Sequence, residues 1–447
     1  MGGAKQTADL EQRGRTLFRW PDKFLGPPPG LKEINAACWG QFILVLLIFF
    51  FLVGAQIKNQ SGIFRDWHCA FIYFYGIGHI ANDYPAVRIY DYSLQQKVFN
   101  EINPAPEGFY GPSPYPPFVA LFFSLFAHFP FNLAYVLWAV ISLTLYISGI
   151  AASLKGAFPG ERLKISLIFC FALEFCPFLV YTFANGQLAA IAVASVGVAI
   201  YQENCSKPIR SGLALSILAY KPSLLLLLIP MLVVTRRFKT LIGFVTGAAI
   251  LSLVATAFTG VQIWPAYVRF LSVFGKVAGL EGHPGLNLAR YIDLSSFSFL
   301  VPGGRSGIGL AILIFVTVTV AAVLSVLLWK SATAGKPAQF LAWAATLTWT
   351  LLLNVYVPIY DSILVVIAIV LTFRALKELE WGAATGWVAL LSVSIFAASW
   401  VAIGIALSHR IQLLSILIGV LGLGQLFLLH RAIRVDPIDT DAALPVR

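Results

Sequence analysis

The stretch WGQFILVLLIFFFLVGA, residues 39–55, decides the class of fold, because it contains no charged residue over seventeen positions. An α-helix needs about 20 apolar residues to cross the hydrocarbon core of a bilayer. Counting this run as 40–57, apolar runs of comparable length lie at 40–57, 132–153, 164–182, 187–202, 239–258, 306–329, 337–355, 385–407 and 410–430. Shorter ones lie at 116–130, 210–220, 223–235 and 360–373. The chain is 59% hydrophobic and only 11% charged, which predicts an all-α polytopic membrane protein.

The basic residues give the orientation. They recur in alternate loops, and the positive-inside rule places such loops in the cytoplasm. We therefore expect a cytoplasmic tail at 1–38, a transmembrane domain at 39–434 and a cytoplasmic tail at 435–447. Two large extracytoplasmic loops follow, at 58–115 and 259–305. The net charge of +11 is expected to anchor the protein to membrane lipids, and nucleic acid is excluded as a partner.

The number of crossings follows from the two tails. Thirteen candidate runs cannot return the chain to the side on which it began, so one short run is expected not to cross. We assign this role to 116–130, because a full crossing there would carry Lys155, Arg162 and Lys164 to the outside. About 12 transmembrane helices result.

The first outer loop holds five of the twenty acidic residues. They are Asp66, Asp83, Asp91, Glu101 and Glu107. Aromatic spacing predicts a helix on the membrane surface over 66–78. A second short helix is expected over 93–100, followed by an irregular, Pro-rich connector over 104–117.

Asp66 is the candidate general base. A carboxylate among aromatic residues at a membrane boundary can be tuned for proton transfer, and Arg65 and His68 stand beside it. The alternative is a helix-start or ion-paired acid, a reading that applies more strongly to Asp83 and Asp91.

Lys221 is the most conspicuous cation, because it lies between two apolar pieces in Leu218-Ala-Tyr-Lys-Pro-Ser-Leu-Leu225. Pro222 breaks the helix there, so Lys221 can face a cavity where a lipid phosphate would satisfy it; simple snorkelling is the alternative. Gln187 and Asp361 stand at similar turns, as ligands or as structural caps. Cations for a phosphate could also come from the second loop, at His283, Arg290 and Arg305.

Glu174 is an acid within an apolar run, and it is either a functional or a hydrogen-bonded structural group. The sequence has no Walker motif, no metal-ligand spacing, no Gly-x-Ser-x-Gly and no disulfide framework, so no cofactor or metal is predicted. Convergence of Asp66, Asp83 and Asp91 on a divalent cation stays open.

The order of several short motifs resembles glycosyltransferase family 87, over about residues 40–375. The motifs are Arg65-Asp66-Trp67, Ile89-Tyr90-Asp91, Tyr115-Pro116-Pro117, Ala134-Tyr135-Val136-Leu137-Trp138, Asn185-Gly186-Gln187, Leu218-Ala219-Tyr220-Lys221-Pro222 and Tyr360-Asp361. The resemblance implies a C-type glycosyltransferase fold in the bacterial cytoplasmic (inner) membrane, with membrane-parallel helices in the first outer loop and the active site on the extracytoplasmic face.

The resemblance also implies an activity. A sugar, expected to be mannose, moves from a polyprenyl-phosphate donor to a hydroxyl of a lipid or glycan acceptor by inverting displacement. Asp66 would be the base, and the donor phosphate would rest on Lys221, Arg290 and Arg65. The residues expected to bind substrate are His68, Tyr75, Asp83, Tyr90, Asp91, Tyr115, Gln187, His283, Tyr360 and Asp361.

Two other classes of function compete. A transporter or flippase of a lipid-linked sugar would use the same cavity without catalysis, and Glu174 lining a continuous pathway would favour it. A non-catalytic membrane scaffold is the second alternative, and it leaves Lys221 at a helix break unexplained.

Overall fold

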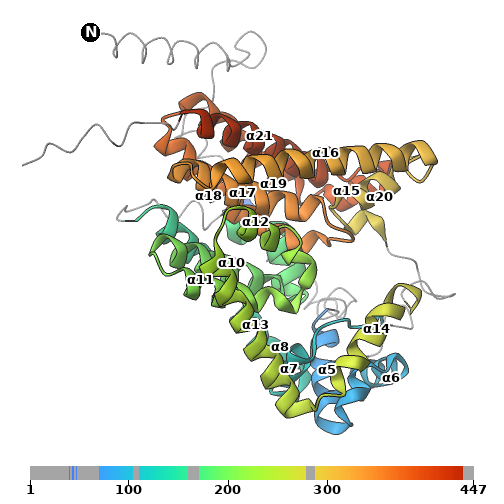
Figure 1. Cartoon of the computed structure of the whole chain (residues 1–447). Coiled ribbons are helices and arrows are strands. Elements are labelled where there is room, and N and C mark those ends of the chain that lie inside the picture. The colour runs from blue at the N-terminus through green and yellow to red at the C-terminus, as the bar shows by residue number, and fades with distance from the viewer. Residues whose placement is uncertain are drawn as a thin grey trace, which may run out of the picture.

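A computed structural model describes residues 70–103, 110–159, 171–277 and 287–435, together with residues 40, 43, 44 and 47 of the first apolar run. The described part is helical, as Figure 1 shows, and contains no β-strand beyond one isolated bridge between Tyr291 and Pro358. The prediction of an all-α protein is therefore confirmed for these residues.

Five helices in the described part are long and apolar enough to cross a membrane. They are α8 (Phe131–Ala157), α13 (Phe238–Thr259), α16 (Gly307–Ser331), the segment Ile359–Glu378, which comprises η7 (Ile359–Leu364) and α18 (Val365–Glu378), and α21 (Leu413–Val435). The protein is a multi-pass membrane protein, and the total of about 12 crossings stays a prediction.

Two further apolar segments are bent pairs of helices. The π-helix η3 (Pro177–Ala184) meets α10 (Ala189–Asn204) at 115°, and α19 (Gly382–Ala398) meets α20 (Ala402–His409) at 70°. The sequence run 385–407 reads as one crossing, but the chain turns sharply between α19 and α20. Counting each pair as one span raises the total from five to seven among the described residues.

The helices of the centre pack closely through glycine. An added Cβ on Gly197 of α10 would lie 2.0 Å from the carbonyl oxygen of Gly149 in α8, so the two backbones touch there. Small residues allow this approach between membrane helices. Beside α10 lie α11 (Pro208–Ser216) and the 3₁₀ turn η4 (Ile217–Tyr220). The chain continues through a second 3₁₀ turn, η5 (Pro222–Leu225), into α12 (Leu228–Val234), and both pack on the buried α17 (Lys336–Leu352).

The first outer loop forms a compact helical unit at the bottom right of Figure 1. It contains α5 (Phe71–Asp83), η1 (Ala86–Tyr90) and α6 (Tyr92–Ile102), followed by α7 (Pro117–Ser124) and η2 (Phe126–His128). Helix α6 matches the helix expected over 93–100. Helix α5 continues to Asp83, beyond the expected end at Gly78, and most of its apolar residues are buried, because α6 and α7 both pack on it.

The 116–130 segment is too short to cross, since α7 has 8 residues before the chain turns into η2. The second outer loop contributes α14 (Ile263–Val277), η6 (Leu288–Arg290) and α15 (Leu294–Leu300). Tyr267 and Phe270 of α14 pack on Tyr90 of the first loop, at ring-centroid distances of 5.1 Å and 5.6 Å. The two outer loops therefore pack against each other.

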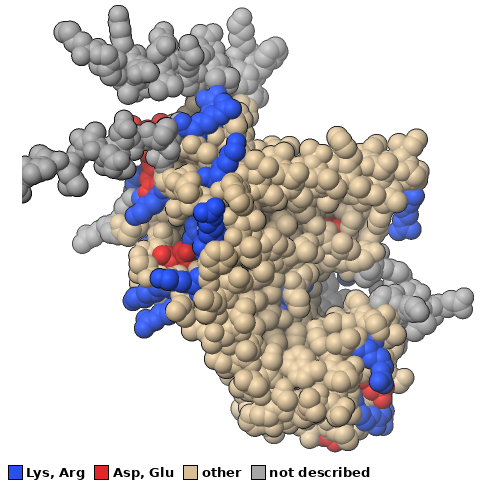
Figure 2. Space-filling model, viewed as in Figure 1, with Lys and Arg blue, Asp and Glu red and all other residues tan. Residues whose placement is uncertain are grey.

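Lys and Arg gather along one edge of the molecule, at the left of Figure 2, and tan surface fills most of the space between this edge and the opposite end. This is the arrangement that basic residues in alternate loops predict.

Candidate functional site

Lys221 lies at a break between two 3₁₀ turns. Its backbone is outside the helical region, at φ −136° and ψ 82°, because Pro222 opens η5 and disfavours a helical residue before it. The break is fixed from the other side by Asn354, whose Nδ2 donates to the Ser223 carbonyl oxygen at 2.6 Å. The local sequence therefore places Lys221 at a non-helical position between the two turns.

The amine of Lys221 donates to Oδ2 of Asp361, a residue 140 positions away, and lies 4.8 Å from the centroid of the Tyr360 ring. The side chain of Asp361 is 1% exposed and that of Lys221 is 17% exposed. Lys221 thus does not snorkel freely. It belongs to a buried ion pair with a cation–π contact, the arrangement that lets a charge remain at this depth.

Three buried polar atoms have no hydrogen-bond partner in the described part of the chain; they belong to the pair itself, to Tyr220 within electrostatic reach of Asp361, and to the turn between η3 and α10, two helices that both pack on η7. They are Asp361 Oδ1, Tyr220 Oη and Gln187 Oε1. Buried polar groups in folded proteins almost always have partners, so such atoms need an explanation. Two of the three are acceptors only, which is the chemistry that binds hydroxyl donors.

Tyr115 adjoins the pair. Burial raises the pKa of the Tyr115 hydroxyl well above its usual value; the neighbouring Tyr360 raises it further and Lys221 partly offsets the rise. Tyr115 therefore remains a neutral hydroxyl beside Lys221 and Asp361 at physiological pH.

The second outer loop is fastened to the turn that precedes Asp361. Asp293 caps α15 by accepting from the Ser296 N–H at 2.8 Å, and its other oxygen accepts from the Val357 N–H at 2.8 Å. The Ile292 N–H donates to the Val357 carbonyl oxygen at 2.9 Å. Asp293 was not singled out from the sequence, although Asp293-Leu294-Ser295-Ser296 is a helix-start pattern.

This loop also brings Arg290 to the site. Burial raises the pKa of Tyr291, and the charges of Lys221 and Arg290 both act against that rise. Tyr291 therefore lies within electrostatic reach of both cations. Arg290 is exposed, in contrast to Lys221.

The Asn185-Gly186-Gln187 turn receives the first outer loop. The Phe71 N–H donates to the Asn185 carbonyl oxygen at 3.0 Å, and Trp138 Nε1 donates to the Gly186 carbonyl oxygen at 3.0 Å. Gly186 has φ +76°, and a Cβ there would lie 2.8 Å from Cβ of Phe71. Only glycine suits both the backbone conformation and the close approach.

Asp66, Arg65 and His68 lie outside the described residues, as does His283. The described chain begins its outer loop at buried Ala70, and Phe71 is hydrogen-bonded to the Asn185-Gly186-Gln187 turn. Asp66 is five residues before Phe71, a separation that spans at most about 17 Å of extended chain.

The other predicted residues build the first-loop unit. The Tyr75 hydroxyl donates to the Phe129 carbonyl oxygen at 2.9 Å, and the Tyr90 hydroxyl donates to that of Tyr115 at 2.9 Å. Asp83 pairs with His79 at 2.6 Å on the surface. Asp91 caps α6 and pairs with Arg88 at 2.8 Å. Of these four residues, Tyr90 is the one that is hydrogen-bonded to a residue of the site in the described chain, because its hydroxyl donates to the carbonyl oxygen of Tyr115.

Glu174 is buried, and neither carboxylate oxygen has a hydrogen-bond partner in the described chain. Its neighbours Phe171 and Phe175 pack against Phe396 of α19. No group of three His, Cys, Asp or Glu side chains among the described residues is placed to hold a metal ion.

Comparison with protein families gives a match between residues 114–358 and the model of glycosyltransferase family 87. No curated protein and no solved structure matches the chain. The matched region includes the Asn185-Gly186-Gln187 turn, the Lys221 break and Tyr291, and it ends at Pro358, three residues before Asp361. It covers more than half of the 447 residues, and the chain therefore belongs to glycosyltransferase family 87.

Proposed function

We propose that this glycosyltransferase moves a sugar, mannose by first choice, from a polyprenyl phosphate to a hydroxyl of a lipid or glycan on the extracytoplasmic face. The observation that carries the proposal is Lys221, a cation held at a helix break beside an acceptor oxygen that has no hydrogen-bond partner among the described residues. A lipid-linked sugar phosphate offers an anion and hydroxyl donors within one molecule, and it therefore complements both groups.

Lys221 is the proposed anchor for the donor phosphate, and Arg290 and Arg65 are proposed to assist it. A phosphate that binds Lys221 competes with Asp361 for the amine, so it weakens the existing ion pair. An unpaired carboxylate at 1% exposure would be costly unless it gained new donors. Sugar hydroxyls are such donors, and we assign Asp361 Oδ1 and Gln187 Oε1 to the recognition of the sugar, with Tyr360 and Tyr115 lining it.

The proposed reaction is an inverting single displacement. The acceptor hydroxyl attacks the anomeric carbon, Asp66 takes the proton from that hydroxyl, and the polyprenyl phosphate leaves with the electrons of the broken C–O bond. Cations that stabilise the departing phosphate lower the barrier, because negative charge develops there in the transition state. Anchoring of Phe71 at the Asn185 carbonyl oxygen supports this role, since it limits how far Asp66 can lie from the site.

The test is transfer of radiolabelled mannose from polyprenyl-phosphate-mannose into lipid extract by purified protein in liposomes. We expect transfer by wild type and a loss on the order of 100- to 10,000-fold in Asp66→Asn, the range of general-base catalysis. The matched control is Glu101→Gln, an exposed acid of the same loop that pairs with Lys97 at 3.8 Å. Equal losses in the two variants would remove Asp66 from the base role.

Two further measurements distinguish an inverting transferase from a retaining transferase and from a flippase. The anomeric configuration of the product, read by NMR, should be opposite to that of the donor, and retention would contradict single displacement. Movement of the labelled donor between leaflets without transfer to any acceptor would identify a flippase instead. If the protein transferred another polyprenyl-linked sugar but not mannose, the donor sugar would be different and the rest of the proposal would be unchanged.

A further inference from the structure

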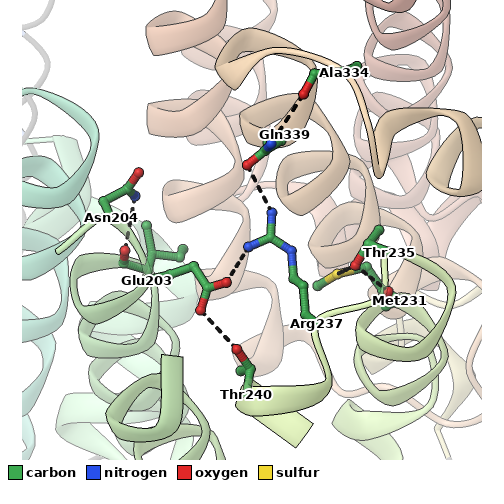
Figure 3. Close-up of polar contacts among 9 residues, drawn as sticks. Glu203, Asn204, Met231, Thr235, Arg237, Thr240, Ala334 and Gln339 are labelled. Atoms are coloured by element: carbon green, nitrogen blue, oxygen red, sulfur yellow. Dashed lines mark hydrogen bonds and ion pairs between the residues drawn. The ribbon is translucent and has the colours of Figure 1, made fainter. Parts of the chain in front are cut away.

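The basic edge of the molecule contains two adjacent arginines with different surroundings. Figure 3 shows Arg237 between α10 and α17: its guanidinium donates to Glu203 through Nη1 and to Oε1 of Gln339 through Nη2, the latter at 3.3 Å. The second oxygen of Glu203 accepts from Thr240 at 3.0 Å. The charge of Arg237 is thus neutralised within the protein.

Arg236 has no such partner in the part of the chain that the structure describes. It is exposed, and its guanidinium lies 5.5 Å from the centroid of the Trp329 ring on α16. Trp329 is itself 61% exposed and is followed by exposed Lys330. None of the ion pairs in the described part of the chain includes Arg236 or Lys330.

More positive charge lies beside Lys330, at the end of α21. Lys330, Arg431 and Arg434 are all within electrostatic reach of His430. Arg431 and Arg434 have no carboxylate partner in the described chain either. The ends of α12, α16 and α21 therefore carry four cations without an acidic counter-ion in this part of the protein.

An open groove of about 290 Å³ is lined by Val234, Ser325, Val326 and Trp329, and Arg236 lies over the ring of Trp329. Val326 and Lys330 are four residues apart on α16, so they lie on the same face, one turn from each other. The groove is apolar, while Arg236 and Lys330 stand at its basic end. An occupant that fits both parts has a hydrocarbon chain and a negatively charged head.

The backbone of Arg236 suits a glycine substitution. Arg236 has φ 56°, in the left-handed region, and it ends α12 in a Schellman motif: its N–H donates to Val233, and the Arg237 N–H donates to Leu232 at 2.8 Å. Ser206 and Glu380 end their helices with the same pair of hydrogen bonds and with left-handed φ values, so this conformation does not by itself indicate a ligand. Because glycine adopts it at the lowest cost, Arg236→Gly can remove the charge without straining the backbone.

We propose that this groove binds one anionic phospholipid of the surrounding membrane. The acyl chain lies along Val234, Val326 and Trp329, and the phosphate is held by Arg236 and Lys330. Guanidinium groups bind phosphate oxygens through paired hydrogen bonds, and basic pockets between membrane helices are suited to anionic head groups. The interaction is separate from sugar transfer and joins α12 to α16.

The experiment measures thermal unfolding of the full-length protein in neutral detergent, with increasing phosphatidylglycerol or phosphatidylcholine. Phosphatidylglycerol should raise the unfolding temperature of wild type and phosphatidylcholine should not, since ligand that binds the folded state stabilises it. In Arg236→Gly the half-saturating phosphatidylglycerol concentration should rise about tenfold or more, as loss of one charge-assisted contact predicts. Native mass spectrometry should show one retained phosphatidylglycerol in wild type and a clearly lower occupancy in the variant at the same lipid concentration.

Arg410→Gly is the matched control. Arg410 is also an exposed arginine that ends a helix at φ 57°, so the substitution removes the same charge and relieves the same backbone strain. It precedes the start of α21, whereas Lys330 lies within electrostatic reach of His430 near the other end of that helix, roughly 30 Å away at 1.5 Å per residue. Arg410→Gly should therefore keep the wild-type response to phosphatidylglycerol.

Since glycine suits position 236, Arg236→Gly should fold at least as stably as wild type in the absence of lipid. Lys330→Gln should weaken the phosphatidylglycerol response independently of any backbone change. Equal stabilisation by phosphatidylcholine, or the same phosphatidylglycerol response in Arg236→Gly and Arg410→Gly, would overturn the assignment.

Discussion

Removal of the Lys221 amine tests whether the buried ion pair holds the site together. In Lys221→Met, Asp361 at 1% exposure loses the donor that satisfies Oδ2, while Oδ1 already lacks a partner in the described chain, so its carboxyl group either stays charged without a counter-ion or takes up a proton. Breaking a buried pair by deleting one member costs about 3–5 kcal/mol. We expect the free energy of unfolding to fall by that amount, because η7 and the 220–222 turn are joined by this contact.

The reverse substitution should cost less. In Asp361→Asn, Lys221 retains the Tyr360 ring at 4.8 Å and, at 17% exposure, some access to water. The double variant Lys221→Met/Asp361→Asn removes both charges, so its loss should be clearly smaller than the sum of the two single losses.

The assay is unfolding of the purified protein in detergent, followed by tryptophan fluorescence, for wild type, both single variants and the double variant. Lys97→Met serves as the surface control, because Lys97 pairs with Glu101 at 3.8 Å with 64% and 59% of the two side chains exposed. Such a pair contributes at most about 1 kcal/mol. If the losses of the two single variants added within about 0.5 kcal/mol in the double variant, the pair would be energetically uncoupled and the reasoning refuted.

Two further predictions concern the first outer loop. Gly186→Ala places a methyl group 2.8 Å from Cβ of Phe71 at φ +76°, so it should destabilise the protein by more than 1 kcal/mol and expose the Ala70–Phe71 region to protease in limited proteolysis; an unchanged cleavage pattern would contradict this packing. Asp91→Ala removes the cap of α6 and should cost about 1 kcal/mol at neutral pH. The hydrogen bond from Arg88 lowers the pKa of Asp91, so its contribution is present above the unfolded-state value near 3.9 and is lost as pH falls through the lower folded-state value. Wild type and Asp91→Ala should therefore converge in unfolding temperature in acid, and a difference that persisted there would exclude the carboxylate as its cause.

Much of the architecture is legible in the sequence, because local patterns encode it. The lengths of the apolar runs predict α8, α13, α16 and α21, and the polar, amphipathic pattern after Asp91 predicts α6. The motifs that surround Lys221 and Gln187 pointed to the site before any contact was known, since a Lys beside Pro within apolar sequence requires a partner.

The tertiary structure alone decided which groups meet. The partner of Lys221 lies 140 residues away, and the Asn185 carbonyl oxygen that anchors Phe71 lies 114 residues away. The sequence contains each member of these pairs but not the path that brings them together. The bend of 70° between α19 and α20 was likewise hidden, because the run 385–407 is apolar throughout and hydropathy measures the affinity of a segment for lipid, not the direction of its axis. Residue type determined what each position needed, and packing among the helices determined which neighbour supplied it.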